Sequence, residues 1–268
     1  RAFTGWSHKR NGDFHLKKNR HDFGEKTFFN KTGNFDGDEI IDIILEQKQC
    51  ARFICDKIYR YFINPTVDEK RLEEITEIFY KDYNIISLMK YIFTSKWFYN
   101  DENIGIKIKS PLELLVGIQK VVPVTFDKKK QLNYLQRMMG QMLLYPDNVA
   151  GWKGGKNWID SNTLMFRMKL PALILNNAII NLEEKGEFED TFDKYYQKEK
   201  KRNKYIKTTK NWGDFDATHK KLSAKELTNL LILSELDKDT AKFLENLEVK
   251  SNRNFCIQLM SIPEYQLC

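Results

Sequence analysis

From residue 38 onward, apolar residues recur at steps of three and four along most of the chain, which is the period of one face of an α-helix. The first such stretch runs to residue 64, where Asn64-Pro65 ends it because the residue before a proline disfavours helical backbone. Its apolar face comprises Ile41, Ile44, Leu45, Phe53, Ile54, Ile58, Tyr61 and Phe62. This pattern predicts one long amphipathic helix.

Start and stop signals predict the helices that follow. Residues 66–69, 110–113 and 223–226 have capping-box spacing, in which a hydroxyl and a carboxylate three residues later each bond an orphan backbone amide. Asp239 is expected to cap a further helix. The predicted helices cover 66–80, 84–98, 110–122, 128–145, 161–182 with a break or kink at Pro171, two stretches that start at 223 and 239, and 254–261. About ten helices joined by short loops, with no repeat of fixed period, predict an all-α array.

Two segments depart from this helical pattern. In residues 1–36, aromatic residues stand among Gly and Asn, and short runs such as 13–16 and 26–29 predict weak strands, hence a small β-hairpin-like region. Residues 184–215 contain few aliphatic side chains and are predicted to be a basic excursion or linker within one helical domain over 1–268. The chain opens at Arg1, inside a run of apparent helical character and without an initiator Met, so we expect a C-terminal fragment of a longer protein.

Composition excludes several classes of protein. With 41% hydrophobic residues and only 13 Gly and 6 Pro in 268 residues, the chain is neither disordered nor collagen-like. The net charge of +7 is a moderate excess, and a dedicated nucleic-acid binder usually has a focused basic face as well, so nucleic acid is not an expected partner. The most apolar run, 170–182, is shorter than the ~20 residues of a membrane span, and no signal-peptide pattern is present. The four cysteines lack metal-ligand spacing, so no metal site is predicted, and no motif indicates a cofactor.

The first candidate site is the adjacent pair His21 and Asp22, followed by Gly24 and Lys26. Histidine and carboxylate together can perform acid–base chemistry. The competing interpretation is structural, in which the two side chains hydrogen-bond the turn at Gly24 and hold the hairpin in place.

The second candidate is the Gly-rich loop 146–159, which contains Trp152, Lys153, Lys156 and Trp158. Indole rings can stack on a sugar, and lysines can bind an anionic group. The loop is not a phosphate-binding Walker loop, because its glycine spacing is one residue short and Asn157 replaces the required Ser or Thr. The competing interpretation is that both tryptophans fill the core.

A series of short segments, in this order along the chain, resembles a known bacterial family, the domain of unknown function 1800. The segments are Arg1-Ala-Phe-Thr-Gly-Trp6, Phe14, His21-Asp22-x-Gly24-x-Lys26, residues 37–41, 107–111, Gly140-Gln141, 148–152 with Trp158-Ile159, Arg167, and Pro263-Glu264-Tyr265-Gln266. Phe3 stands where the family usually has Leu, and the Lys-rich stretch 184–215 departs from the shared pattern.

The resemblance implies a mostly helical, extracytoplasmic protein that is located in the periplasm, at the cell surface or outside the cell. It also implies a helical region before the Arg1 segment, and a partner that is an exported protein similar to the alkaline phosphatase superfamily. It implies no established activity. The sequence therefore leaves three hypotheses.

The leading hypothesis is a protein that binds a cell-surface polymer, such as a surface polysaccharide, or a protein partner. Its contact residues would be Trp152, Lys153, Lys156 and Trp158, with Lys26, His21 and Asp22 nearby. The alternative is a hydrolase of a cell-surface polymer that uses His21 and Asp22 with a further carboxylate from Glu25, Asp147 or Asp160. The third is a scaffold in which these residues serve only packing.

Overall fold

The computed structural model describes residues 1–176, 206–247 and 249–268. These residues form eleven α-helices and three two-stranded antiparallel sheets. The prediction of a mostly helical chain with a small N-terminal hairpin region is therefore confirmed. Most of the predicted basic segment 184–215, and the predicted end of the helix at 177–182, lie outside the described residues.

The described residues divide into two compact units, Arg1–Tyr99 and Asn100–Cys268. Each unit has buried clusters made only of its own residues. One domain over 1–268 would require the two units to unfold together, and this stays a prediction.

Unit 1 begins with two small hairpins. Strand β1 (Trp6–His8) pairs with β2 (Phe14–Leu16), and β3 (Lys26–Phe28) pairs with β4 (Lys31–Gly33). The helical character expected at the start of the chain is wrong, because the Thr4 amide donates to the Arg1 carbonyl in a turn and β1 starts at Trp6. Gly5 takes φ +79°, and a Cβ there would lie 2.7 Å from the Lys17 carbonyl oxygen, so only glycine fits this turn.

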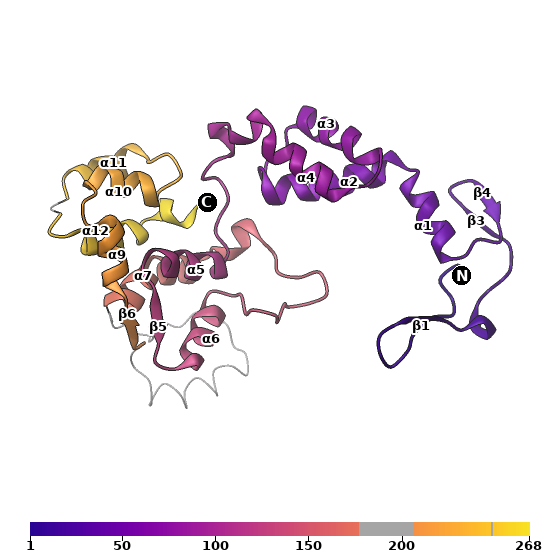
Figure 1. Ribbon diagram of the computed structural model, residues 1–268, viewed down its shortest axis with the longest axis horizontal. Coiled ribbons are helices and arrows are strands. Elements are labelled where there is room, and N and C mark those ends of the chain that lie inside the picture. Colours follow the sequence, from indigo (N-terminus) through magenta and orange to yellow (C-terminus); the bar gives the residue numbers. More distant parts are fainter. Residues whose placement is uncertain (177–205, 248) are drawn as a thin grey trace. The chain divides into compact units, whose positions relative to one another are not determined.

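Four helices complete unit 1, namely α1 (Gly37–Leu45), α2 (Lys48–Phe62), α3 (Glu69–Tyr80) and α4 (Ile85–Thr94) (Figure 1). The single helix predicted over 38–64 is wrong at one point, because it is interrupted between α1 and α2. The Tyr83 hydroxyl donates to the Leu45 carbonyl at 2.7 Å, and the Tyr80 hydroxyl donates to the Glu46 carbonyl at 2.6 Å. These phenols, which come from a distant part of the sequence, satisfy carbonyls at the end of α1.

The interior of unit 1 lies between α2, α3 and α4. Its fully buried residues include Ala51, Cys55, Leu72, Ile75, Leu88 and Ile92. Apolar side chains at helical spacing on α3 therefore contact both neighbouring helices.

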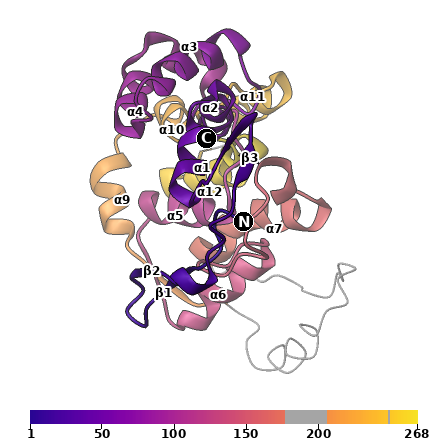
Figure 2. The same cartoon turned by 90° about the vertical axis from the view of Figure 1, so that its right-hand side faces the viewer.

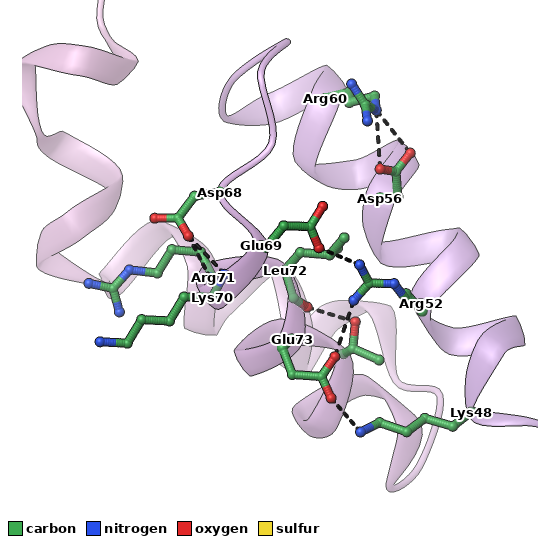
Figure 3. A network of polar contacts seen from close by, with 11 residues as sticks. Lys48, Arg52, Asp56, Arg60, Asp68, Glu69, Lys70, Arg71, Leu72 and Glu73 are labelled. Carbon is green, nitrogen blue, oxygen red and sulfur yellow. Dashed lines mark hydrogen bonds and ion pairs between the residues drawn. The ribbon is translucent and has the colours of Figure 1, made fainter.

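A polar network joins α2 to α3 at the surface (Figure 3). Lys48 Nζ lies 2.5 Å from Glu73 Oε1, and Arg52 pairs with both Glu69 and Glu73. The capping box predicted at 66–69 is wrong, because Asp68 caps α3 by accepting from the Lys70 and Arg71 amides. Glu69 is thereby available to pair with Arg52.

Unit 2 contains the remaining described α-helices and strands (Figures 1 and 2). Its helices are α5 (Pro111–Val121), α6 (Lys129–Met138), α7 (Ser161–Asn176), α9 (Trp212–His219), α10 (Ala224–Leu231), α11 (Lys238–Glu245) and α12 (Asn252–Met260). Its strands β5 (Val124–Phe126) and β6 (Thr208–Lys210) pair antiparallel, and short 3-10 turns occur at Gly155–Trp158 and Pro263–Gln266.

Local signals in unit 2 are partly confirmed. The capping boxes at 110–113 and 223–226 are present. The predicted cap Asp239 is wrong, because Asp237 caps α11 and Asp239 follows in its first turn. The helix predicted over 128–145 ends at Met138, and the residues after it include Gly140 at φ +81° and Leu144 at φ +62°, which no helix accommodates. Helix α7 continues through Pro171.

The centre of unit 2 is α12, which packs on α7, α9 and α10. Phe255, Cys256, Leu259 and Met260 are each at most 2% exposed. The chain then returns to the start of the unit, where residues 107–109 pair antiparallel with 266–268. The Lys109 amide donates to the Gln266 carbonyl at 2.8 Å, and the Cys268 amide donates to the Lys107 carbonyl at 2.8 Å. This pairing brings together two segments from opposite ends of the unit.

Candidate functional site

Asp22 is held by the first residue of the chain. Its Oδ2 lies 2.7 Å from Arg1 Nε, and its Oδ1 accepts from the Gly24 amide at 2.8 Å. The hydrogen bond from Arg1 and the one from Gly24 hold the pKa of Asp22 well below its usual range. A Cβ at Gly24 would lie 2.8 Å from Arg1 Nη2 and 3.0 Å from Asp22 Oδ1, so a larger residue there would displace the Arg1 side chain from this contact. Asp22 is therefore an ionised hydrogen-bond acceptor that closes the N-terminal turn.

His21 contacts the same turn. Its Nδ1 lies 2.8 Å from the Thr4 carbonyl oxygen, while the Thr4 hydroxyl accepts from the Asp22 amide at 2.8 Å. Within unit 1, no hydrogen bond joins the His21 and Asp22 side chains to each other. The two residues are neighbours in the sequence. Their contacts agree with the structural interpretation, in which they hold the turn, rather than with an acid–base dyad.

Lys26 is buried, with only 7% of its surface exposed. Its Nζ donates to the Gly24 carbonyl at 3.0 Å and to Asn34 Oδ1 at 3.4 Å. Lys26 thus ties the second hairpin to the Gly24 turn. The three unit 1 residues predicted for the site do converge on one turn, and their contacts are with the protein itself.

The other residues predicted to contact a ligand belong to unit 2, where one is buried and the other three have exposed surface. Trp158 is 8% exposed and lies in the core, as the packing interpretation expects. Trp152 is half-buried, and Lys153 and Lys156 are exposed. Among the carboxylates offered for a hydrolase, Asp160 Oδ1 accepts from the Asn162 and Thr163 amides at the start of α7, and Glu25 and Asp147 are exposed.

A buried polar cluster that sequence reasoning did not assign lies at the paired segments of unit 2. Arg167 of α7 is 0% exposed. Its Nε donates to Gln266 Oε1 at 3.0 Å, and its Nη2 donates to the Lys109 carbonyl at 2.6 Å. Desolvation lowers the pKa of Arg167 to about 10. Burying a cation among neutral acceptors costs several kcal/mol, as an order of magnitude, so this arrangement is costly to maintain.

Lys109 adds a second cation to this cluster. Its Nζ donates to the Tyr265 carbonyl at 2.6 Å and lies 3.9 Å from the centroid of the Tyr265 ring. Desolvation lowers the pKa of Lys109. Beside it, Glu113 accepts from the Ser110 amide, and Gln141 Oε1 accepts from the Leu112 amide at 3.0 Å. The cluster therefore holds charged and polar groups of both signs.

An open surface pocket of about 290 Å³, almost wholly apolar where it faces solvent, adjoins the cluster. Ile108, Ile159, Leu164 and Leu267 contribute to its apolar wall, and Glu264 and Gln266 are its polar lining residues. Glu264 is 8% exposed and Gln266 is 3% exposed. Glu264 Oε2, Gln266 Nε2 and Arg167 Nη1 are buried and have no hydrogen-bond partner among the residues that the structure describes. Unsatisfied buried atoms are uncommon in folded proteins, so three in one cluster mark it as a candidate site.

One signal in the sequence did point to this cluster. Residues 107–111, Gly140-Gln141, Arg167 and 263–266 are four of the segments that carried the family resemblance, and each contributes to it. None forms a local chemical motif, because residues in direct contact, such as Lys109 and Tyr265, are 156 positions apart along the chain.

Comparison with family models identifies the family of this chain. The chain is a mostly helical protein, and residues 1–267 match the model of the family described as "Protein of unknown function (DUF1800)". The chain belongs to this family. No curated protein and no solved structure matches it. None of the described helices is long and apolar enough to span a membrane, and no cluster of three or more His, Cys, Asp or Glu side chains in the described ranges could hold a metal ion.

Proposed function

We propose that this protein binds a cell-surface polymer, an acidic polysaccharide, and that residues 142–157 form the contact surface. The observation that carries the proposal is the exposure of aromatic and basic side chains together on this loop. Tyr145 is 74% exposed, Trp152 is half-buried, and Lys153 and Lys156 are exposed.

The chemistry of the loop fits such a polymer. The faces of sugar rings carry C–H groups that pack against aromatic side chains. Lysine binds carboxylate or phosphate as a compact charge, and neither Lys153 nor Lys156 forms an ion pair with the described part of the chain. Gly151 and Gly155 have φ of +84° and +61°, which turns the backbone sharply on both sides of Trp152 and Lys153. Trp158 supports this surface from the core rather than touching the polymer.

The family resemblance supports an extracytoplasmic location for this activity. It also supports an exported protein similar to the alkaline phosphatase superfamily as a partner in polymer handling. In the hydrolase alternative, His21 and Asp22 would be catalytic, and no observation on the described residues favours that role over the turn contacts they make.

Titration calorimetry with oligogalacturonate and with a neutral cello-oligosaccharide tests the proposal. We expect the acidic oligosaccharide to bind, and both Trp152→Ala and the double variant Lys153→Ala/Lys156→Ala to weaken binding at least tenfold. The matched control is Lys221→Ala/Lys225→Ala, which removes the same charge from exposed positions of the same unit and should leave the affinity within twofold. Equal losses in the two double variants would refute a specific loop site. Failure of every polysaccharide, followed by capture of an exported protein that requires Trp152, would replace the polymer with a protein partner.

A further inference from the structure

The loop between α6 and α7 carries three exposed aliphatic side chains close together. Leu143 is 58% exposed, Leu144 is 88% exposed, and Val149 is wholly exposed; these three residues are called the aliphatic tip. Single exposed apolar residues are common on protein surfaces, but three within one short loop form an apolar patch. An acidic polysaccharide accounts for Trp152 and Lys153 on this surface, but it brings no hydrocarbon chain to cover the aliphatic tip.

The backbone conformation makes Leu144 costly to keep at its position. Its φ is +62°, a left-handed conformation in which a branched side chain crowds the backbone and which glycine or asparagine adopts more easily. The side chain gains little packing in return, because 88% of its surface is exposed. Strain of this kind is typical of binding segments, where it is part of how the site is held ready for its ligand. The conformation and exposure of Leu144 therefore indicate a ligand that offers hydrocarbon.

The backbone of the same loop has internal hydrogen bonds that suit it to an apolar environment. The Leu143 amide donates to Oε1 of Gln136, a buried side chain of α6, at 2.8 Å. The Tyr145 amide donates to the Met142 carbonyl at 3.0 Å, and the next residue, Pro146, has no amide hydrogen. An amide that loses water without finding another partner costs free energy, so these bonds lower the cost of placing the loop in an apolar medium.

Aromatic and basic side chains accompany the aliphatic tip along the chain. Tyr145 is 74% exposed, Trp152 is half-buried, and Lys153 and Lys156 are exposed. Asp147 is the single carboxylate of residues 142–157, so the loop keeps a positive net charge. Aliphatic, aromatic and cationic side chains are the three kinds that contact, respectively, the acyl chains, the interface and the anionic head groups of a lipid layer.

We propose that the polymer bound by residues 142–157 is a lipid-anchored acidic polysaccharide, and that the protein binds it at the surface of the bilayer that holds the anchor. The aliphatic tip enters the boundary between head groups and acyl chains, and Tyr145 lies at the interface. Lys153 and Lys156 contact the anionic groups of the sugar chain. This inference rests on the polymer-binding proposal for the sugar, and it adds the aliphatic tip as a separate contact with lipid.

A protein partner fits the aliphatic tip less well than a lipid layer does. A specific protein interface takes roughly 20–30 residues from each side, whereas the apolar residues in question lie on the single loop 142–150. A lipid layer sets no such requirement, because its acyl chains surround whatever small apolar group enters them. The positive charge of Lys153 and Lys156 is also complementary to an acidic sugar chain or to anionic lipid head groups.

Vesicle co-sedimentation with the full chain tests this inference. The probe is oligogalacturonate coupled through its reducing end to phosphatidylethanolamine and embedded in phosphatidylcholine vesicles. We expect the native chain to bind this probe at least tenfold more tightly than it binds free oligogalacturonate. Three control vesicles should bind at least tenfold more weakly than the probe: phosphatidylcholine alone, phosphatidylcholine with phosphatidylglycerol, and phosphatidylcholine with a lipid-linked neutral cello-oligosaccharide.

The double variant Leu143→Ser/Leu144→Asn removes two residues of the aliphatic tip. Asparagine tolerates a left-handed φ better than leucine does, so the Tm of this variant should not fall. It should lose the tenfold gain from the lipid anchor and keep its affinity for free oligogalacturonate within twofold. The matched control is Leu230→Ser/Leu233→Asn, which makes the same changes at leucines of unit 2 that are 51% and 53% exposed and should keep the gain.

The outcomes distinguish this inference from the polymer-binding proposal. Equal affinity for free and lipid-linked oligogalacturonate, or a gain that survives Leu143→Ser/Leu144→Asn, overturns the lipid contact and leaves the loop as a polysaccharide site. Equal binding to phosphatidylglycerol vesicles overturns the lipid-anchored polysaccharide in favour of an anionic bilayer alone. If every vesicle binds through the aliphatic tip and free oligogalacturonate does not bind at all, the polymer-binding proposal fails as well.

Discussion

Replacing Ile75 by alanine tests whether the two compact units unfold independently. Ile75 is 0% exposed in α3, a helix that contacts α2 on one side and α4 on the other. Large-to-small substitutions of buried aliphatic residues cost roughly 2–5 kcal/mol, and the cost rises when the surroundings cannot collapse into the space. Because neighbouring helices enclose Ile75, we expect a value in the upper half, about 3–5 kcal/mol.

Differential scanning calorimetry measures this effect directly. If each unit unfolds by itself, the trace has two transitions, and Ile75→Ala moves only the one belonging to Arg1–Tyr99. In a domain of this size 1 kcal/mol shifts the midpoint by roughly 4–8 °C, so we expect a decrease of at least about 12 °C. The transition of Asn100–Cys268 should stay in place, since its core contains none of the residues around Ile75.

The control for this experiment is Ile86→Ala, which makes the same chemical change at a side chain that is 80% exposed. It should change stability by no more than about 0.5 kcal/mol. One transition that moves as a whole in Ile75→Ala would refute independent units and support a single domain over 1–268. Two transitions with no shift in either would refute the packing argument itself.

Two further predictions concern single side chains. In His21→Ala, loss of the contact with the Thr4 carbonyl should lower the free energy of unfolding by about 1 kcal/mol without affecting hydrolysis of any polymer. If a reducing-end assay shows that this variant loses turnover while its Tm is unchanged, the hydrolase hypothesis is favoured instead. The hydrogen bond from the Thr240 hydroxyl, with those from the Thr240 and Asp239 amides, lowers the pKa of Asp237 to about 2. The unfolded chain binds this proton more readily than the folded one. The contribution of Asp237 to stability is therefore complete above its ordinary pKa of 3.8 and is lost as the pH falls toward 2. Urea unfolding between pH 5 and pH 2 should accordingly show a shallower decline in the free energy of unfolding for Asp237→Asn than for the native chain. An identical decline in the variant would show that Asp237 does not drive the acid sensitivity.

Much of the local structure could be predicted because it depends on near neighbours in the sequence. Apolar spacing located the helices, and the boxes at Ser110 and Ser223 gave two of their starts correctly. At 66–69 and at Asp239 the predicted N-cap was two residues away from the observed one. In both cases a nearby aspartate, Asp68 or Asp237, accepts from the amides at the start of the helix instead. The interruption between α1 and α2 could not be predicted, because hydroxyls of Tyr80 and Tyr83 from a distant segment satisfy carbonyls there.

The candidate sites divide in the same way. His21, Asp22 and Lys26 were found because they are close in sequence, and the exposed loop with Lys153 and Lys156 was found from its composition. The cluster of Arg167, Glu264 and Gln266 was decided only by tertiary structure, since pairing of residues 107–109 with 266–268 brings it together. Sequence pattern determines which backbone amides and apolar faces need partners nearby, but which distant polar atoms are buried together, and which are left without a partner, depends on how the helices pack.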